Sequence, residues 1–105
     1  MSSETKPIST EEFKLALSDL TNENINSVLS QLERSISKLK ETNEYLEKEI
    51  EQTSDQESID LYKETISENV EVMKNQSARL DAISEELSRR GVKPSKEEEQ
   101  EGIYL

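Results

Sequence analysis

Apolar residues recur at alternating intervals of four and three along two long stretches of this chain. The first stretch runs through Ile25, Leu29, Leu32, Ile36, Leu39, Asn43, Leu46 and Ile50. The second runs through Ile59, Tyr62, Ile66, Asn69, Met73, Gln76, Leu80, Ile83 and Leu87. Such a heptad pattern is typical of a coiled coil, in which one stripe of each helix packs against a partner helix. The spacing predicts two long helices, at about 22–52 and 55–90, each with one such seam.

The polar segment between the two seams decides how the helices pair. Residues 51–57 carry no seam position, and Ser54 with Glu57 predicts a capping box at the start of the second helix. Because a short connection makes consecutive helices antiparallel neighbours, we predict an all-α fold, an antiparallel two-helix coiled-coil hairpin over residues 21–91. A parallel dimer would give the same seams, and the short connection argues against it.

Three seam positions are polar. Asn43, Asn69 and Gln76 stand where apolar residues would stabilise a coiled coil more, and such residues often specify register at a cost in stability. The alternative is a loosely packed, hydrated coiled coil. In the register set by the connection, Asn43 faces Ile66 and Asn69 faces Leu39, so we expect no hydrogen bond between the two asparagines.

A short helix is predicted before the hairpin. Ser9 and Glu12 have the spacing of a capping box, and Phe13, Leu17 and Leu20 share one face, which predicts a helix over residues 8–20. Thr21 offers the cap of the next helix. This helix could fold onto the open end of the hairpin and supply burial that two helices alone lack; self-association, as in a homodimer, or a different protein could also supply it.

The termini carry little apolar material. Residues 1–7 predict a disordered lead-in, and residues 92–105 an acidic disordered tail that follows a left-handed helix cap at Gly91. The tail ends in Ile103-Tyr104-Leu105, which resembles the hydrophobic-tyrosine-any tails by which proteasome-binding ATPases and activators enter the core particle.

Composition excludes several classes of function. The 105 residues hold 24 acidic and 13 basic side chains, a net charge of −11, with neither cysteine nor histidine. We therefore expect no enzyme, no metal site, no cofactor and no nucleic-acid binding, because thiolate, imidazole and clustered basic groups are missing. No signal peptide or membrane-length apolar run stands out, so we expect a cytoplasmic and nuclear protein without membrane association.

Two apolar residues lie outside the seam of the second helix. Leu61 and Val72 are about three turns apart and share one stripe. They are interpreted either as scattered surface residues or as a docking stripe.

Several stretches together resemble the fungal translation-machinery-associated family of ATPase-dedicated chaperones. The resemblance spans most of residues 8–90, and the residues outside the seam give it specificity. The matching residues are Glu11, Glu12, Phe13, Lys14, Ala16, Ser18, Ser35, Ile36, Leu39, Asn43, Leu46, Lys48, Ile50, Leu61, Tyr62, Lys63, Glu68, Asn69, Val72, Asn75, Arg79, Asp81 and Ala82. The connection and the tail are shorter here than in the family.

The resemblance implies an assembly chaperone. Such a protein binds a proteasomal AAA-ATPase subunit and promotes its pairing with a neighbouring ATPase during assembly of the regulatory-particle base. We expect contacts from three groups of residues: Phe13, Leu17 and Leu20 as anchors; Leu61, Tyr62 and Val72 as secondary contacts; and the tail residues Ile103, Tyr104 and Leu105, which could reach the core particle. The alternatives are a structural coiled-coil scaffold and, less favoured, a prefoldin-like holdase.

Overall fold

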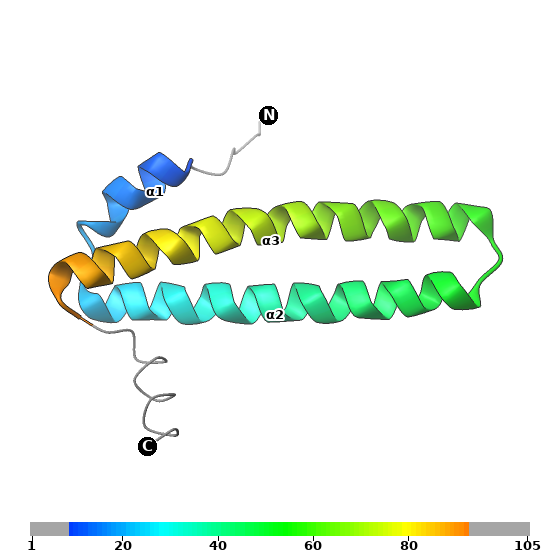
Figure 1. Cartoon of the computed structure of the whole chain (residues 1–105), viewed down its shortest axis with the longest axis horizontal. Helices are drawn as coiled ribbons and strands as arrows, with labels where there is room; N and C mark the ends of the chain where they lie inside the picture. Colours follow the sequence, from blue (N-terminus) through cyan, green and yellow to red (C-terminus); the bar gives the residue numbers. More distant parts are fainter. Residues whose placement is uncertain (1–8, 93–105) are drawn as a thin grey trace, which may run out of the picture. The chain divides into compact units, whose positions relative to one another are not determined.

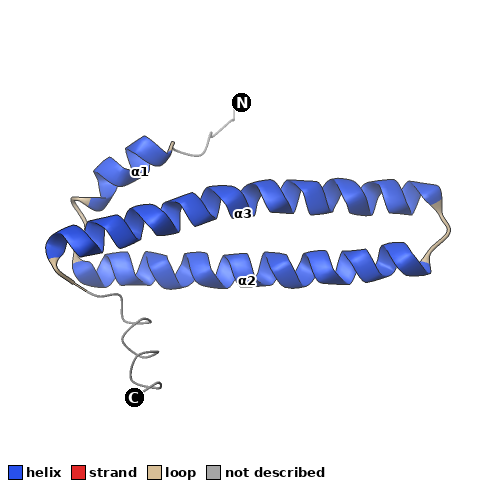
Figure 2. Ribbon diagram, in the orientation of Figure 1, coloured by secondary structure: helices blue, strands red, loops and turns tan. Residues whose placement is uncertain are grey.

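The computed structural model describes residues 9–92, which form three helices and no strand. Helix α1 spans Thr10–Leu17, α2 spans Asn22–Gln52 and α3 spans Gln56–Arg90 (Figures 1 and 2). The all-α prediction is confirmed for this part of the chain. The lead-in over residues 1–7 and the tail over 92–105, apart from Val92, lie outside the described residues.

The described chain divides into two compact units. Unit 1 contains residues 9–29 and 78–92, and unit 2 contains residues 30–77. In each unit, the segments of α2 and α3 run antiparallel, as expected for a hairpin (Figure 1). Unit 1 also holds α1.

Helix α1 is shorter than the predicted segment of residues 8–20. It ends at Leu17, where the Ser18 hydroxyl donates to the carbonyl oxygen of Leu15 at 2.8 Å. The backbone N–H groups of Asp19 and Leu20 then bond to carbonyls three residues earlier. A serine that bonds to the preceding turn, followed by such tight turns, closes a helix.

Thr21 caps α2 as predicted, but the predicted cap of α3 is wrong. The Thr21 hydroxyl accepts from the Asn24 N–H at 3.1 Å. At α3, however, the Asp55 carboxylate accepts from the N–H and the hydroxyl of Ser58, at 3.0 and 2.7 Å, so Asp55 replaces Ser54 as the cap. A carboxylate is the stronger acceptor and its charge suits the positive end of the helix. These two hydrogen bonds, the hydroxyl's first, lower the pKa of Asp55.

Helix α3 ends as predicted in a left-handed glycine cap. Gly91 has a φ of 75°, and its N–H donates to Ser88 O while the Val92 N–H donates to Leu87 O. These two bonds form a Schellman motif, which satisfies carbonyls that the helix end would leave free.

The most deeply buried side chains belong to unit 1. Leu17, Ile25, Ile83 and Leu87 are almost completely inaccessible to solvent. In unit 2, only Leu46 and Asn43 count as buried, and the remaining seam residues there are half-buried. Two helices leave the sides of their seam open, so nearly complete burial occurs where α1 adds a third helix.

The two seam asparagines bond to each other, against expectation. The amide nitrogen of Asn69 donates to the amide oxygen of Asn43 at 2.9 Å. Backbone positions alone place each of the two asparagines opposite an apolar residue. Each Cα–Cβ bond of a helix tilts towards the helix N-terminus. In an antiparallel pair, the Asn43 side chain therefore leans away from the connection and the Asn69 side chain leans towards it, so the two amides converge.

Candidate partner-binding site

Helix α1 begins at the predicted capping box. The Ser9 hydroxyl accepts from the Glu12 N–H at 3.1 Å, and the Glu12 carboxylate accepts from the Ser9 N–H at 3.2 Å. This reciprocal pair satisfies two N–H groups at the start of a helix of only two turns. The capping box thus fixes the start of the helix on which we expect residues that bind a partner.

The three predicted anchors of α1 have different environments. Leu17 is 1% exposed and belongs to the core of unit 1. Phe13 is half-buried, with the guanidinium carbon of Arg79 5.2 Å from its ring centroid, and Leu20 is half-buried after the helix has ended. The structure therefore gives Leu17 the role of a core residue, because its side chain is almost completely buried.

Arg90 joins the ends of the three helices in unit 1. Its guanidinium donates to the Leu17 carbonyl at 2.9 Å, to the Asn22 side-chain oxygen at 2.8 Å and to the Glu86 carboxylate at 2.7 Å. The first bond satisfies a carbonyl at the end of α1. The contacts of Arg90 with α1 and α2 were not predicted from the sequence.

Glu86 is the buried acid of this cluster, with a side chain only 6% exposed. Arg90 and Arg89 both donate to its carboxylate, and these hydrogen bonds, that of Arg90 first, lower the pKa of Glu86. The sequence did show a glutamate followed three and four residues later by arginines, but not that this glutamate is buried. Its charge is compensated inside the unit, so it is not free to bind a ligand.

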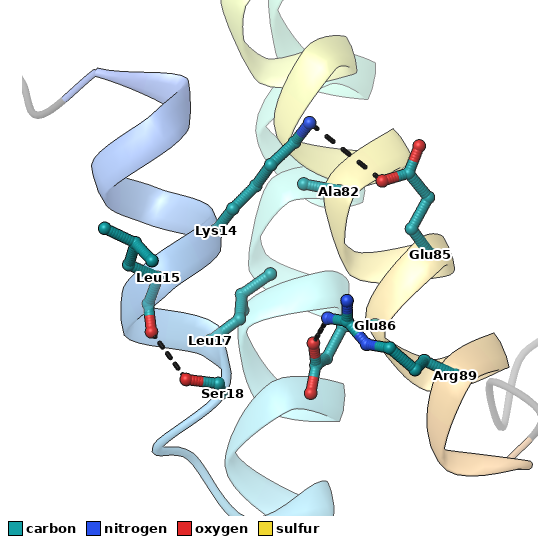
Figure 3. A pocket seen from close by; sticks show the side chains of 8 residues that line it. All are labelled: Lys14, Leu15, Leu17, Ser18, Ala82, Glu85, Glu86 and Arg89. Carbon is teal, nitrogen blue, oxygen red and sulfur yellow. Dashed lines mark hydrogen bonds and ion pairs between the residues drawn. The ribbon is translucent and has the colours of Figure 1, made fainter.

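A pocket lies between α1 and α3 in unit 1 (Figure 3). It has a volume of about 330 Å³ and is lined by Lys14, Leu15, Leu17, Ser18, Ala82, Glu85, Glu86 and Arg89. The Lys14 ammonium is 4.0 Å from the Glu85 carboxylate. The pocket thus combines an apolar portion, from Leu17 and Ala82, with charged groups of both signs.

Leu15 is the most exposed large apolar side chain among the described residues. It is 73% exposed and in Figure 3 it lies on the side of α1 away from α3. The expected face of α1 comprised Phe13, Leu17 and Leu20, so Leu15 was missed. Together, the pocket and Leu15 make the surface of α1 the candidate partner-binding site.

The remaining predicted contacts belong to unit 2 or to the tail. Leu61 and Val72 are 59% and 41% exposed, whereas Tyr62 is half-buried. Tyr45 and Val70 are exposed as well and were not predicted. The tail residues Ile103, Tyr104 and Leu105 lie outside the described residues.

Neither a group of metal ligands nor a membrane-spanning helix is found in the part of the chain that the structure describes. Between residues 9 and 92, no three histidine, cysteine, aspartate or glutamate side chains are grouped as metal ligands would be. None of the helices in that range is both long and apolar enough to cross a bilayer.

Comparison with known proteins places the chain in a family. The TMA17 helical domain matches residues 9–94, which is most of the chain. The chain belongs to the TMA17 family. One similar member is Translation machinery-associated protein 17 of Saccharomyces cerevisiae (strain ATCC 204508 / S288c), with 32% identity over 98 residues. That alignment covers 77% of this chain and 65% of the yeast protein. No solved structure matches the chain.

Family membership confirms the resemblance drawn from the sequence. The matched residues include all of α1, α2 and α3, so the candidate site on α1 falls within the TMA17 helical domain. The chain spans about two thirds of the length of the yeast relative.

Proposed function

We propose that the chain is an assembly chaperone that binds a proteasomal AAA-ATPase subunit. In this role it promotes pairing of that subunit with a neighbouring ATPase during assembly of the regulatory-particle base. Family membership supports the proposal, together with the resemblance described above. The proposal assigns no catalytic role, and it includes the expected cytoplasmic and nuclear location.

The observation that carries the proposal is the surface of α1. Leu15 is 73% exposed on one side of α1, and on the other side α1 and α3 form a pocket whose apolar portion comes from Leu17 and Ala82. In helix-in-groove recognition, a few exposed apolar side chains of a helix enter a groove of the partner and contribute most of the affinity, and Leu15 is suited to this role. Phe13 presents its partly exposed ring on the same short helix.

The electrostatic balance also suits a protein partner. A net charge of −11 repels other acidic surfaces and attracts basic ones, which raises the rate of encounter with a basic partner. We therefore propose that the client surface on the ATPase subunit is basic around an apolar centre.

The test mixes the full chain with the C-terminal domain of each proteasomal ATPase subunit and measures mass by size-exclusion chromatography with light scattering. We expect a stoichiometric complex with one of them. Leu15→Ala should weaken that complex, whereas Tyr45→Ala, which also truncates an exposed apolar side chain, should not. Absence of any complex would overturn the proposal.

A structural coiled-coil scaffold is the second candidate. The half-buried seam of unit 2 favours it, because a second chain could cover those side chains. A stable homodimer or tetramer at every concentration, without an ATPase complex, would establish this alternative.

A further inference from the structure

Leu61 and Val72 form an exposed apolar stripe on α3 in unit 2. They are 59% and 41% exposed and eleven residues apart, which is about three helical turns on one face. Val70 is 44% exposed, yet its distance of nine residues from Leu61 places it on the opposite side of the helix. The stripe is thus separate from both the seam and Val70.

A row of glutamates borders this stripe. Glu57, Glu64, Glu68 and Glu71 are all exposed, and at about 100° per residue they lie on one side of the stripe. None of the ion pairs between residues 9 and 92 includes any of the four. We call these four residues the acidic row.

The lysines of the same segment lie elsewhere. Lys63 and Lys74 are exposed, but the helical period places both on the side of α3 opposite the stripe. The flank of the stripe therefore carries four carboxylates that form no ion pair within the described residues, and only Glu71 has a lysine of this segment, Lys74, three or four residues away. An apolar stripe with one acidic flank complements a helix that has apolar residues and one basic flank.

In unit 1, the short helix α1 packs against α3. Phe13 and Leu17 of α1, four residues apart, face α3; the Phe13 ring lies beside Arg79, and Leu17 lines a pocket with Ala82. Apolar side chains on one face of the incoming helix make these contacts, while a charged group packs on the aromatic ring. In unit 2, Leu61 and Val72 of the same helix α3 are exposed, and no helix among the described residues covers them.

We propose that Leu61, Val72 and the acidic row bind an amphipathic helix of another protein. That helix has two apolar residues three turns apart and lysines or arginines along one flank. A second copy of this chain is a poor occupant, because its net charge is −11 and its own acidic row would face a like charge. Leu61 and Val72 were expected above as secondary contacts of an ATPase subunit, but this inference is argued from the stripe and the acidic row alone, so it does not rest on the proposed function.

The experiment uses the full chain and a designed peptide. The peptide is a fluorescent helix of about 18 residues with two leucines eleven residues apart and lysines on one flank, and binding is measured by anisotropy. A second peptide has glutamates in place of the lysines. We expect the lysine peptide to bind, the glutamate peptide not to bind, and added salt to weaken the complex.

Variants of the chain locate the binding surface. Leu61→Ala with Val72→Ala should weaken binding of the lysine peptide by about ten-fold or more, because truncating central anchors removes most of the affinity. Val70→Ala is the matched control on the same helix and should bind as the wild type does. Alanine favours helix at these exposed positions, so folding is retained, which circular dichroism checks.

Three results would overturn the inference. These are a wild-type chain that binds neither peptide, equal binding of the two peptides, and a Leu61→Ala, Val72→Ala variant that binds as the wild type does. Analytical ultracentrifugation tests whether a second copy of the chain covers the stripe instead. A homodimer that dissociates when Leu61 and Val72 are replaced would assign the stripe to that second copy and also overturn the inference. Failure of peptide binding leaves the proposed ATPase complex unaffected, because that complex is measured separately.

Discussion

The side-chain amide of Asn69 donates a hydrogen bond to the side-chain oxygen of Asn43, which lies 26 residues earlier in the sequence. Asn43 is only 8% exposed, so the bond satisfies groups that water reaches poorly. A polar pair of this kind fixes which layers of α2 and α3 face each other within unit 2, at some cost in stability.

Removing one partner of this pair should destabilise the chain more than replacing both. We expect Asn43→Ala or Asn69→Ala to lower the free energy of unfolding by about 1–2 kcal/mol, since each leaves an amide without its partner. The double replacement by leucine should raise it, because an apolar layer then fills the seam. Urea unfolding followed by circular dichroism measures all three; a double variant less stable than the wild type would contradict this account.

Truncation of Leu17 should destabilise the chain much more than truncation of Leu15. Leu17 is 1% exposed and Leu15 is 73% exposed on the same short helix. We expect Leu17→Ala to lower the free energy of unfolding by about 2–5 kcal/mol through lost burial and a cavity, and Leu15→Ala to change it by less than about 0.5 kcal/mol. Thermal unfolding of the two variants checks this, and equal losses would mean that Leu15 is also a core residue.

Glu86 should make the stability of unit 1 sensitive to acid. Hydrogen bonds from Arg90 and Arg89 lower the pKa of Glu86 below its ordinary value of 4.5. A lowered pKa in the folded state means that this contribution to stability is complete above about pH 4.5. It is lost as the pH falls through the lowered pKa, when the carboxylate takes up a proton.

Glu86→Gln should therefore flatten the pH dependence of unfolding below the ordinary glutamate pKa. The measurement is the thermal midpoint from neutral pH down to about pH 3, compared with the wild type. Glu85→Gln is the matched control, because this neighbouring side chain is 70% exposed. Parallel curves for the wild type and Glu86→Gln would show that the Arg90 contacts do not depend on this charge.

Gly91 should tolerate no side chain without strain, although there is room for one. A Cβ at this position would meet no atom within 4 Å, yet the backbone φ of 75° lies in the left-handed region. We expect Gly91→Ala to lower the free energy of unfolding by about 1 kcal/mol, and Gly91→Asn by less, because asparagine adopts this conformation more readily. Chemical denaturation of both variants tests the order.

The heptad spacing was sufficient to predict two long helices, their seams and the antiparallel pairing. Caps were predicted where the chain offered one clear candidate, as at Ser9, Thr21 and Gly91. The prediction of a cap was wrong between Gln52 and Gln56, where Ser54 and Asp55 are both suitable caps. Asp55 caps the helix because its carboxylate is the stronger acceptor. Local signals do not rank adjacent candidates.

The candidate site was less predictable than the fold. The face of α1 that is apolar in sequence is the face that packs inward, so Leu17 became a core residue and Leu15, off that face, became the exposed one. The partners of Arg90 lie on three helices, and only tertiary packing brings the Leu17 carbonyl within its reach. Contacts between groups more than seventy residues apart leave no periodic signal.

The composition of unit 1 from two distant stretches has a consequence for the order of folding during synthesis. Residues 30–77 are contiguous, so unit 2 has all its partners as soon as that stretch has emerged. Leu17 and Ile25 are synthesised early but obtain Ile83 and Leu87 only after the last turns of α3 have been made. We therefore expect unit 2 to close first from local contacts, and α1 to complete its packing only when Ile83 and Leu87 are also available.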